Sequence, residues 1–168
     1  MKNKIISIFV LSVFIFSGFS MNVQAQSNER VTLGFDLTDI QEEEMLKDFG
    51  VSKDNVKIDR ITNDDIINQL GLDPNDQSNY TGGAYSSSYV KLTTSNGIIV
   101  DATNLTEVTG LMLSNALLTS GVTNAEVKAS SPFPVTGTSA LAGILKGFES
   151  IQGEEISLNN KKTAQKEI

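Results

Sequence analysis

Ser88 and Lys91 lie three residues apart in the stretch SSSYVK, the spacing at which a lysine activates a nucleophilic serine in some hydrolases. This chemistry requires both side chains on one face, as at the start of a helix. The flanking residues, 85–94, read as a strand, and residues three apart on a strand point to opposite faces. The companion motifs S-D-N and K-T-G do not occur. A Ser/Lys-dependent hydrolase is therefore a less favoured alternative.

Oxygen-bearing side chains gather in the turn-forming stretch of residues 71–84. Asp73, Asn75 and Asp76 carry the hard oxygen ligands that Ca²⁺ prefers, which makes them the candidate metal ligands of the chain. The stretch has no glycine at the sixth position and no glutamate at the twelfth position of an EF-hand loop. Asp and Asn are also common turn residues. We expect turn formation here rather than a metal site, and we predict no cofactor.

The turn VTGTS at 135–139 is a candidate ligand site because it precedes a helix pattern. Backbone N–H groups at a helix start can hold an anion, so Thr136, Gly137, Thr138 and Ser139 are the candidate ligand-binding residues. No lysine or arginine adjoins the turn, which weakens this interpretation.

Paired carboxylates are the remaining candidates for a catalytic site. Asp36, Asp39 and the acidic run 42–44 could supply a general acid and base, but they match no motif, and a solvated helix start explains them better. The sequence contains no His and no Cys. Their absence removes the histidine base, Cys and Ser–His nucleophiles, the usual zinc sites and disulfides. We predict no catalytic residues and favour a protein that is not an enzyme, although the question stays open.

The N-terminus has the pattern of a secretory signal peptide. Lys2 and Lys4 precede an apolar run of about 15 residues, too short for a bilayer span of about 20, and a small-x-small motif predicts cleavage between Ala25 and Gln26. We expect a secreted, extracytoplasmic protein that is not an integral membrane protein after cleavage. The predicted organisation is a signal peptide at 1–25, one α/β domain at 26–152, and a helical or disordered tail at 153–168.

The charge of the mature chain restricts its partners. Removal of Lys2 and Lys4 leaves 11 basic against 20 acidic residues, a formal net charge of −9. Nucleic acid is not expected as a partner, because its phosphates require clustered lysine and arginine. An unidentified envelope partner is expected instead.

Apolar periodicity and capping residues predict the elements that position these groups. Strands are expected at 31–35, 56–61, 85–94, 98–102 and 125–129, and helices at 38–50, 62–71, 109–120 and after 135. Asn96 and Gly97 predict a hairpin between the third and fourth strands. Pro132 and Pro134 are expected to end sheet pairing, and Thr136 or Thr138 to cap the last long helix.

The order of elements predicts an α/β fold. Two βαβα-like units are joined through the β-hairpin, in a mixed sheet of about five strands covered by helices. The equal lengths of 38–50 and 109–121 suggest a weak internal repeat. Ser139, Gly143 and Gly147 recur every fourth residue, which predicts that a neighbouring helix or the sheet lies close to that helix face.

The segments VTLGFDLT, SSSYVK and NALLTSGVTNAEVKASSPFPVTGTSALAGILKGFE are similar to the YpuA-like family of exported bacterial proteins, domain of unknown function 1002. The resemblance covers most of residues 29–168 and implies export, but no activity and no catalytic residues. Members of the family usually continue into a further helical region.

The favoured function is therefore a non-catalytic binding or interaction domain of the cell envelope. A carboxylate- or Ser/Lys-dependent hydrolase is one alternative, and a structural fragment of a longer parent protein is another.

Overall fold

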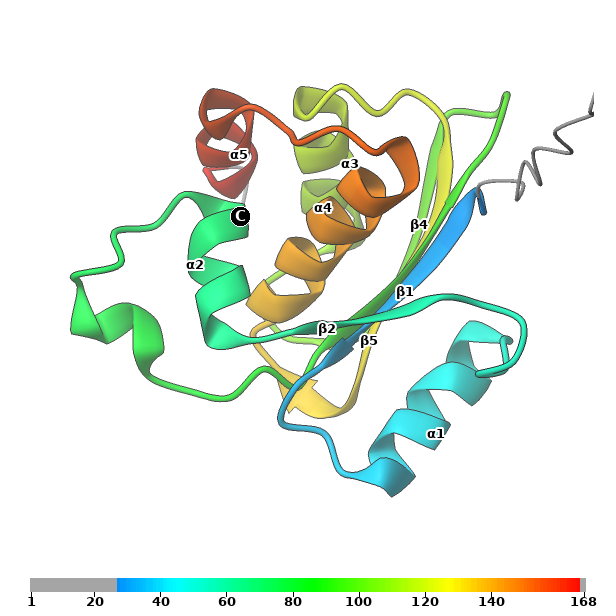
Figure 1. Cartoon of the computed structure of the whole chain (residues 1–168), viewed down its shortest axis with the longest axis horizontal. Coiled ribbons are helices and arrows are strands. Elements are labelled where there is room, and N and C mark those ends of the chain that lie inside the picture. The colour runs from blue at the N-terminus through cyan, green and yellow to red at the C-terminus, as the bar shows by residue number, and fades with distance from the viewer. Residues whose placement is uncertain (1–26, 167–168) are drawn as a thin grey trace, which may run out of the picture.

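The computed structural model describes residues 27–166 as a twisted sheet with helices on both faces (Figure 1). The signal sequence and its cleavage site at Ala25 and Gln26 lie outside the described residues. The strands are β1 (Glu29–Gly34), β2 (Ile58–Ile61), β3 (Ser87–Leu92), β4 (Ile98–Leu105) and β5 (Ala125–Val135). The helices are α1 (Asp39–Phe49), α2 (Asn63–Leu70), α3 (Gly110–Thr119), α4 (Thr138–Gln152) and α5 (Leu158–Gln165), with a 3₁₀ turn η1 (Gln77–Tyr80).

The mixed five-stranded sheet is confirmed, with the strand order β2-β1-β3-β5-β4. The parallel pairs β1–β2 and β4–β5 flank β3, which runs antiparallel to both of its neighbours. The expected β3–β4 hairpin is wrong. Asn96 and Gly97 both adopt a left-handed backbone conformation, but β5 inserts between the two strands.

The composition of β4 and β5 explains this order. Val127 and Ala129 of β5 are buried in the core, whereas the outward residues of β4, such as Ile99 and Asp101, are exposed. The more buried strand therefore takes the interior position, and β4 forms an edge, where exposed polar side chains are tolerated.

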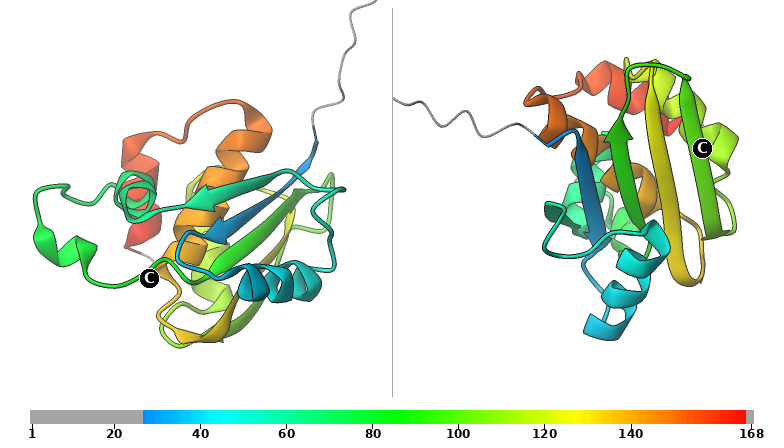
Figure 2. Two further views of the ribbon diagram at one scale, coloured as in Figure 1. Left: turned by 60° about the horizontal axis from the view of Figure 1, so that its bottom comes forward. Right: turned by 90° about the vertical axis from the view of Figure 1, so that its right-hand side faces the viewer.

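Helices α2, α3, α4 and α5 cover one face of the sheet, and α1 covers part of the other (Figures 1 and 2). The strands joined by α1 and by α3 all run in one direction, and both connections step toward the β2 edge. Because α1 and α3 lie on opposite faces, the two crossovers have opposite hands, and one of them is the rare left-handed kind. The suggested internal repeat is therefore not a repeat in structure.

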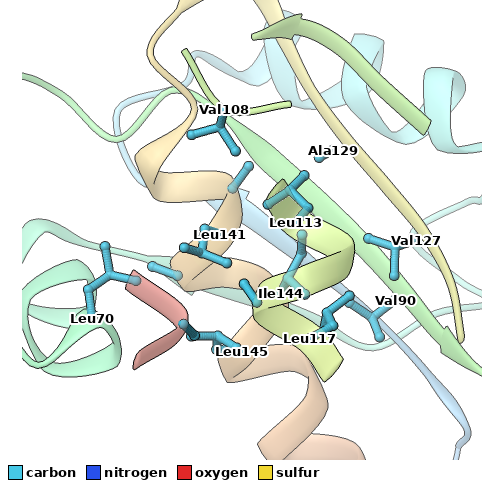
Figure 3. Close-up of a cluster of buried hydrophobic side chains, with 14 of the residues drawn as sticks. Leu70, Val90, Val108, Leu113, Leu117, Val127, Ala129, Leu141, Ile144 and Leu145 are labelled. Carbon is cyan, nitrogen blue, oxygen red and sulfur yellow. The ribbon is translucent and has the colours of Figure 1, made fainter. Parts of the chain in front are cut away.

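Two hydrophobic clusters hold these layers together. The larger one fills the space between β3, β5 and the helices α2–α5, and Figure 3 shows Leu113 and Leu117 of α3 meeting Leu141 and Ile144 of α4 over the sheet. The smaller cluster joins α1 to β1 and includes Met45, Leu46 and Phe49. All seven of these side chains are at most 4% exposed.

The close approach predicted for the glycine face of α4 is confirmed, and its partner is the sheet. A Cβ atom on Gly143 would lie 2.9 Å from Ser88 Oγ and closer still to Thr32 Oγ1. These two hydroxyls hydrogen-bond to each other at 2.6 Å beneath the helix. Only glycine leaves room for this packing, which brings the α4 backbone down onto β1 and β3.

Strand β5 continues through both prolines to Val135, but its pairing with β3 ends before them, at Ser130. The prediction that the prolines end sheet pairing therefore holds for β3, whereas the pairing with β4 resumes after them. The register shifts between Thr103 and Leu105, and Leu105 then pairs with Val135. Asn104, with φ of 58°, lies at this irregularity and donates through Nδ2 to the Ser131 carbonyl at 2.8 Å. A bulge of this kind lets a strand pass residues that have no N–H group to donate.

The last helix packs into the larger cluster through Ala164, which is fully buried. Lys161 Nζ lies 2.7 Å from Glu149 Oε1, which ties α5 to α4. Among residues 27–166, no helix combines the length and the apolar character that crossing a membrane requires.

Candidate functional site

A cavity of about 440 Å³ opens where the N-terminal ends of α2 and α4 meet the loop between α2 and β3. Its walls carry amides, hydroxyls, backbone groups and a few apolar side chains, and they include Tyr85. The lining residues are Asn63, Ile66, Leu72, Asn79, Thr81, Gly82, Gly83, Tyr85, Ser86, Val135, Thr136, Gly137, Thr138 and Ser139. All four sequence-predicted ligand residues therefore lie at one cavity, together with part of the loop at residues 71–84.

The N-terminus of α4 owes its shape to Gly137, the N-cap residue. Its φ of 103° is left-handed, and a Cβ atom there would lie 2.9 Å from Val108 Cβ. The expected cap by Thr136 or Thr138 is wrong, because no side-chain hydrogen bond caps the helix locally. Instead, Ser86 Oγ accepts from the Ala140 N–H at 2.8 Å, across 54 residues of sequence.

Ser86 and Ser139 form a buried hydroxyl pair on the cavity floor. Their Oγ atoms lie 2.6 Å apart, and Ser139 Oγ also contacts the Ser86 N–H and carbonyl, each at 3.1 Å. The Ser139 hydroxyl is thus engaged within the protein, which leaves the backbone N–H as the available donor of this residue. Neither that N–H nor the N–H of Thr138 has an acceptor within residues 27–166.

The candidate metal ligands serve as turn-forming residues. Asp73 Oδ1 accepts from the Asn75 backbone N–H at 2.9 Å, and Asp76 Oδ1 accepts from the Ser78 hydroxyl at 2.7 Å. Hydrogen bonds from the Ser78 side chain and backbone lower the pKa of Asp76. Within the described residues, no group of three His, Cys, Asp or Glu side chains could hold a metal ion.

Asparagines fasten this loop around the cavity. Asn63 Nδ2 donates to the Gly82 carbonyl at 3.2 Å, and Asn79 Nδ2 donates to the Asp73 carbonyl at 2.8 Å. These bonds leave the side-chain oxygens of both asparagines as acceptors at the cavity wall.

The structure does not bring the Ser–Lys pair together. Ser88 is buried under α4, where its hydroxyl meets Thr32, whereas Lys91 pairs in register with Glu29 and Glu126 and faces the opposite side of the sheet. This separation follows the strand geometry that the sequence predicts.

The acidic residues near α1 are not gathered into a catalytic pair either. Asp36 Oδ2 accepts from the Ala84 N–H at 2.7 Å, and Glu42 forms an ion pair with Arg60 of β2. That pair raises the pKa of Arg60 through its hydrogen bond to Glu42. Neither carboxylate lines the cavity.

Sequence reasoning missed Asn63, Asn79, Tyr85 and Ser86 as cavity residues. Asn63 was expected only to start a helix, and the serines before β3 only to form a strand. The Gly82–Gly83 pair before Tyr85 is the sequence feature that could have indicated close packing at the tyrosine. A Cβ atom on Gly83 would collide with the tyrosine ring.

Comparison with known proteins places the chain in a family. The family model described as "Protein of unknown function (DUF1002)" matches residues 33–168. A Bacillus subtilis (strain 168) protein, "Uncharacterized protein YpuA", is 33% identical over 138 residues, which cover 82% of this chain and 47% of that protein. The chain thus spans about half the length of this curated relative, and no solved structure matches it. The chain belongs to the DUF1002 family of proteins of unknown function.

Proposed function

We propose that this protein is a non-catalytic binding domain of the cell envelope that acts outside the cytoplasm, and that the cavity between α2 and α4 holds its ligand. One observation carries the proposal. The cavity is large enough for a small molecule, and its lining contains no Asp, Glu, Lys or Arg. It therefore offers hydrogen bonds and apolar contact without a charged side chain.

The chemistry of the lining argues against catalysis there. A general acid or base needs a group that titrates near the working pH, and a serine nucleophile needs such a base beside it. Ser86 and Ser139 bond to each other and to backbone groups, and no basic side chain lines the cavity. The chain contains no histidine and no cysteine.

The envelope location is supported by the sequence. Residues 1–25 have the charge and apolar pattern of a secretory signal. Because the chain has no cysteine, it can fold outside the cytoplasm without forming disulfides. Because the chain spans 47% of the YpuA protein, the proposal concerns this domain and its cavity.

A sedimentation assay tests the proposal. The mature chain from Gln26 is mixed with a purified bacterial envelope fraction and centrifuged, together with two variants. Thr138→Trp fills the cavity, whereas Thr123→Trp adds the same side chain at an exposed site outside its lining. We expect the native chain and Thr123→Trp to sediment with the envelope, and Thr138→Trp to stay in solution while keeping its circular dichroism spectrum. No sedimentation of the native chain, or equal sedimentation of all three, would overturn the proposal.

A further inference from the structure

We infer that the cavity takes a neutral, polyhydroxylated ligand, a sugar unit of a glycan, that packs against Tyr85. This inference rests on the proposed function, because it names the ligand class of the same cavity. It is carried by the hydrogen-bonding groups of the lining, by the charges that border it and by the fixed tyrosine ring.

Size and polarity fit such a ligand. The volume of about 440 Å³ lies within the range of about 300–1,000 Å³ that is typical of small-molecule sites. Ile66, Leu72 and Val135 supply apolar wall between the polar groups. A sugar presents the same alternation, with C–H surfaces between its hydroxyls.

Donors and acceptors both face the ligand. The Thr138 and Ser139 N–H groups supply donors, since neither has an acceptor in the described part of the chain. The Asn63 and Asn79 oxygens supply acceptors, because their NH₂ groups are used to hold the loop. A hydroxyl both donates and accepts, so one class of ligand group satisfies both walls.

The bordering charges disfavour an anion, the ligand that the helix start alone would suggest. Asn79 Nδ2 donates to the Asp73 carbonyl, and Glu107 N–H donates to the Thr136 carbonyl, so the backbones of two acidic residues contact the lining. Asp64 and Asp65 adjoin lining residues along the chain, and only Asp65 is neutralised, by Lys146. These acidic residues adjoin the lining, and their negative charge disfavours the binding of a phosphate or carboxylate.

The same end of α4 disfavours a cation. The N-terminus of a helix carries a partial positive charge, and here Thr138 and Ser139, whose N–H groups have no acceptor in the described part of the chain, line the cavity. Acidic residues adjoin the lining and the positive end of the α4 dipole borders the cavity, so a neutral ligand is the class that neither charge repels.

Tyr85 gives the cavity an immobilised aromatic surface. Its ring centroid lies 5.2 Å from that of Phe133, at 57° to its plane, and the missing side chain of Gly83 leaves room for the ring. Tyr85 also packs against the smaller hydrophobic cluster, which helps to fix its position. Tyr85 itself is half-buried and lines the cavity. An aromatic ring offers a large apolar contact and, in tyrosine, a hydroxyl for a polar partner, which matches the C–H face and rim of a sugar.

Titration of neutral oligosaccharides into the ¹⁵N-labelled mature chain tests this inference. The probes are a trimer of N-acetylglucosamine and maltotriose, with inorganic phosphate as the anionic comparison. We expect at least one trimer to shift the amide signals of Gly82, Gly83, Thr138 and Ser139, and phosphate to leave them in place. Affinity should change little between low and high salt, because a neutral ligand has no charge to screen.

Variants at two lining residues, Tyr85 and Asn79, test which side chains bind the sugar. Tyr85→Leu should weaken binding by about tenfold or more, and Tyr85→Phe much less, because the ring provides the contact. Asn79→Ala should also weaken binding and does not alter the tyrosine, so it keeps the test decisive if Tyr85→Leu unfolds. Thr123→Trp should bind like the native chain.

The outcomes separate this inference from the proposed function. If neither trimer shifts the cavity signals, or if phosphate does, the sugar class is wrong. If envelope sedimentation is nevertheless lost in Thr138→Trp, the binding function stands without it. If sedimentation fails as well, both proposals fail.

Discussion

The two ends of α4 differ in the charge of the side chains around them. At the N-terminal end, Gly137, Thr138 and Ser139 border a cavity without an acidic or basic side chain. In the C-terminal half, Lys146 pairs with Asp65 of α2 and Glu149 pairs with Lys161 of α5, each at 2.7 Å. Charged groups thus fix the helix to its neighbours at one end, which leaves the other end free to present hydrogen-bonding groups to a ligand.

The Glu149–Lys161 pair of the charged end is nearly closed to solvent. The Glu149 and Lys161 side chains are 12% and 11% exposed, and Glu149 also accepts from Gln69 Nε2 and from the Ile156 N–H. One carboxylate therefore joins α2, α4 and the segment that leads to α5. Such a buried group is costly to leave without its counter-charge.

Loss of the buried Glu149–Lys161 pair should have the largest effect on stability among the predicted changes. We expect Lys161→Ala to lower the free energy of unfolding by about 3–5 kcal/mol, because Glu149 would remain buried without a cation. Chemical denaturation measures this effect, and Lys162→Ala, an exposed neighbour, should cost far less. Equal losses in the two variants would show that the pair does not anchor α5.

The middle of α4 allows a sharper comparison between two glycines one turn apart. Gly143→Ala should destabilise the fold by about 1–3 kcal/mol, because its Cβ atom would overlap the Thr32 and Ser88 hydroxyls. A Cβ atom on Gly147 would meet Arg30 and Val90 at 3.7 Å, an ordinary contact. Gly147→Ala should therefore gain up to about 1 kcal/mol of helix propensity.

Thermal and urea denaturation of these two alanine variants should give opposite signs. Two losses of similar size would mean that helix position, rather than contact with the sheet, decides the effect. The comparison uses one substitution twice in one helix, so differences in side-chain entropy cancel.

The ion pair between α4 and α2 should produce a smaller, pH-dependent effect. Burial would raise the pKa of Asp65, but hydrogen bonds from Lys146 and from Thr62 outweigh it and lower the pKa. A carboxyl whose pKa is lower in the folded state stabilises the fold above its unfolded pKa of about 4, and this contribution is lost as the pH falls through the folded value.

Asp65→Asn should therefore flatten the decline of stability on the acid side, below about pH 4, when denaturation is followed from pH 7 to pH 2.5. Asp64→Asn is the matched control, since Asp64 is the exposed neighbour. An acid decline of native steepness in Asp65→Asn would show that other carboxyls cause it.

Local signals in the sequence predicted the parts of this fold that depend on local bonds. Capping residues predicted a helix at 38–50, and Thr38 and Gln41 form the capping box of α1, while Gly50 ends the helix in a left-handed conformation. Such caps join residues three or four positions apart, so sequence spacing reveals them.

Long-range choices were not predictable in the same way. The cap of α4 comes from Ser86, and the place of β5 between β3 and β4 depends on which strand buries better. The candidate site shows the same limit. Residues 136–139 were found because they precede a helix, whereas Asn63 and Tyr85 reach the cavity only through tertiary packing.

Changes in the loop at residues 71–84, beside the N-terminal end of α4, should have the smallest effects on stability. Asp73 and Asp76 already use their carboxylate oxygens for turns, so millimolar Ca²⁺ should leave the melting temperature unchanged, whereas a cation bound only by the folded state would raise it. Asp73→Ala should cost no more than about 0.5 kcal/mol, as for most surface substitutions. Differential scanning calorimetry with and without Ca²⁺ measures both. A calcium-dependent rise that disappears in Asp73→Ala would place a cation beside the cavity, and the field that now favours a neutral ligand would then favour an anionic one.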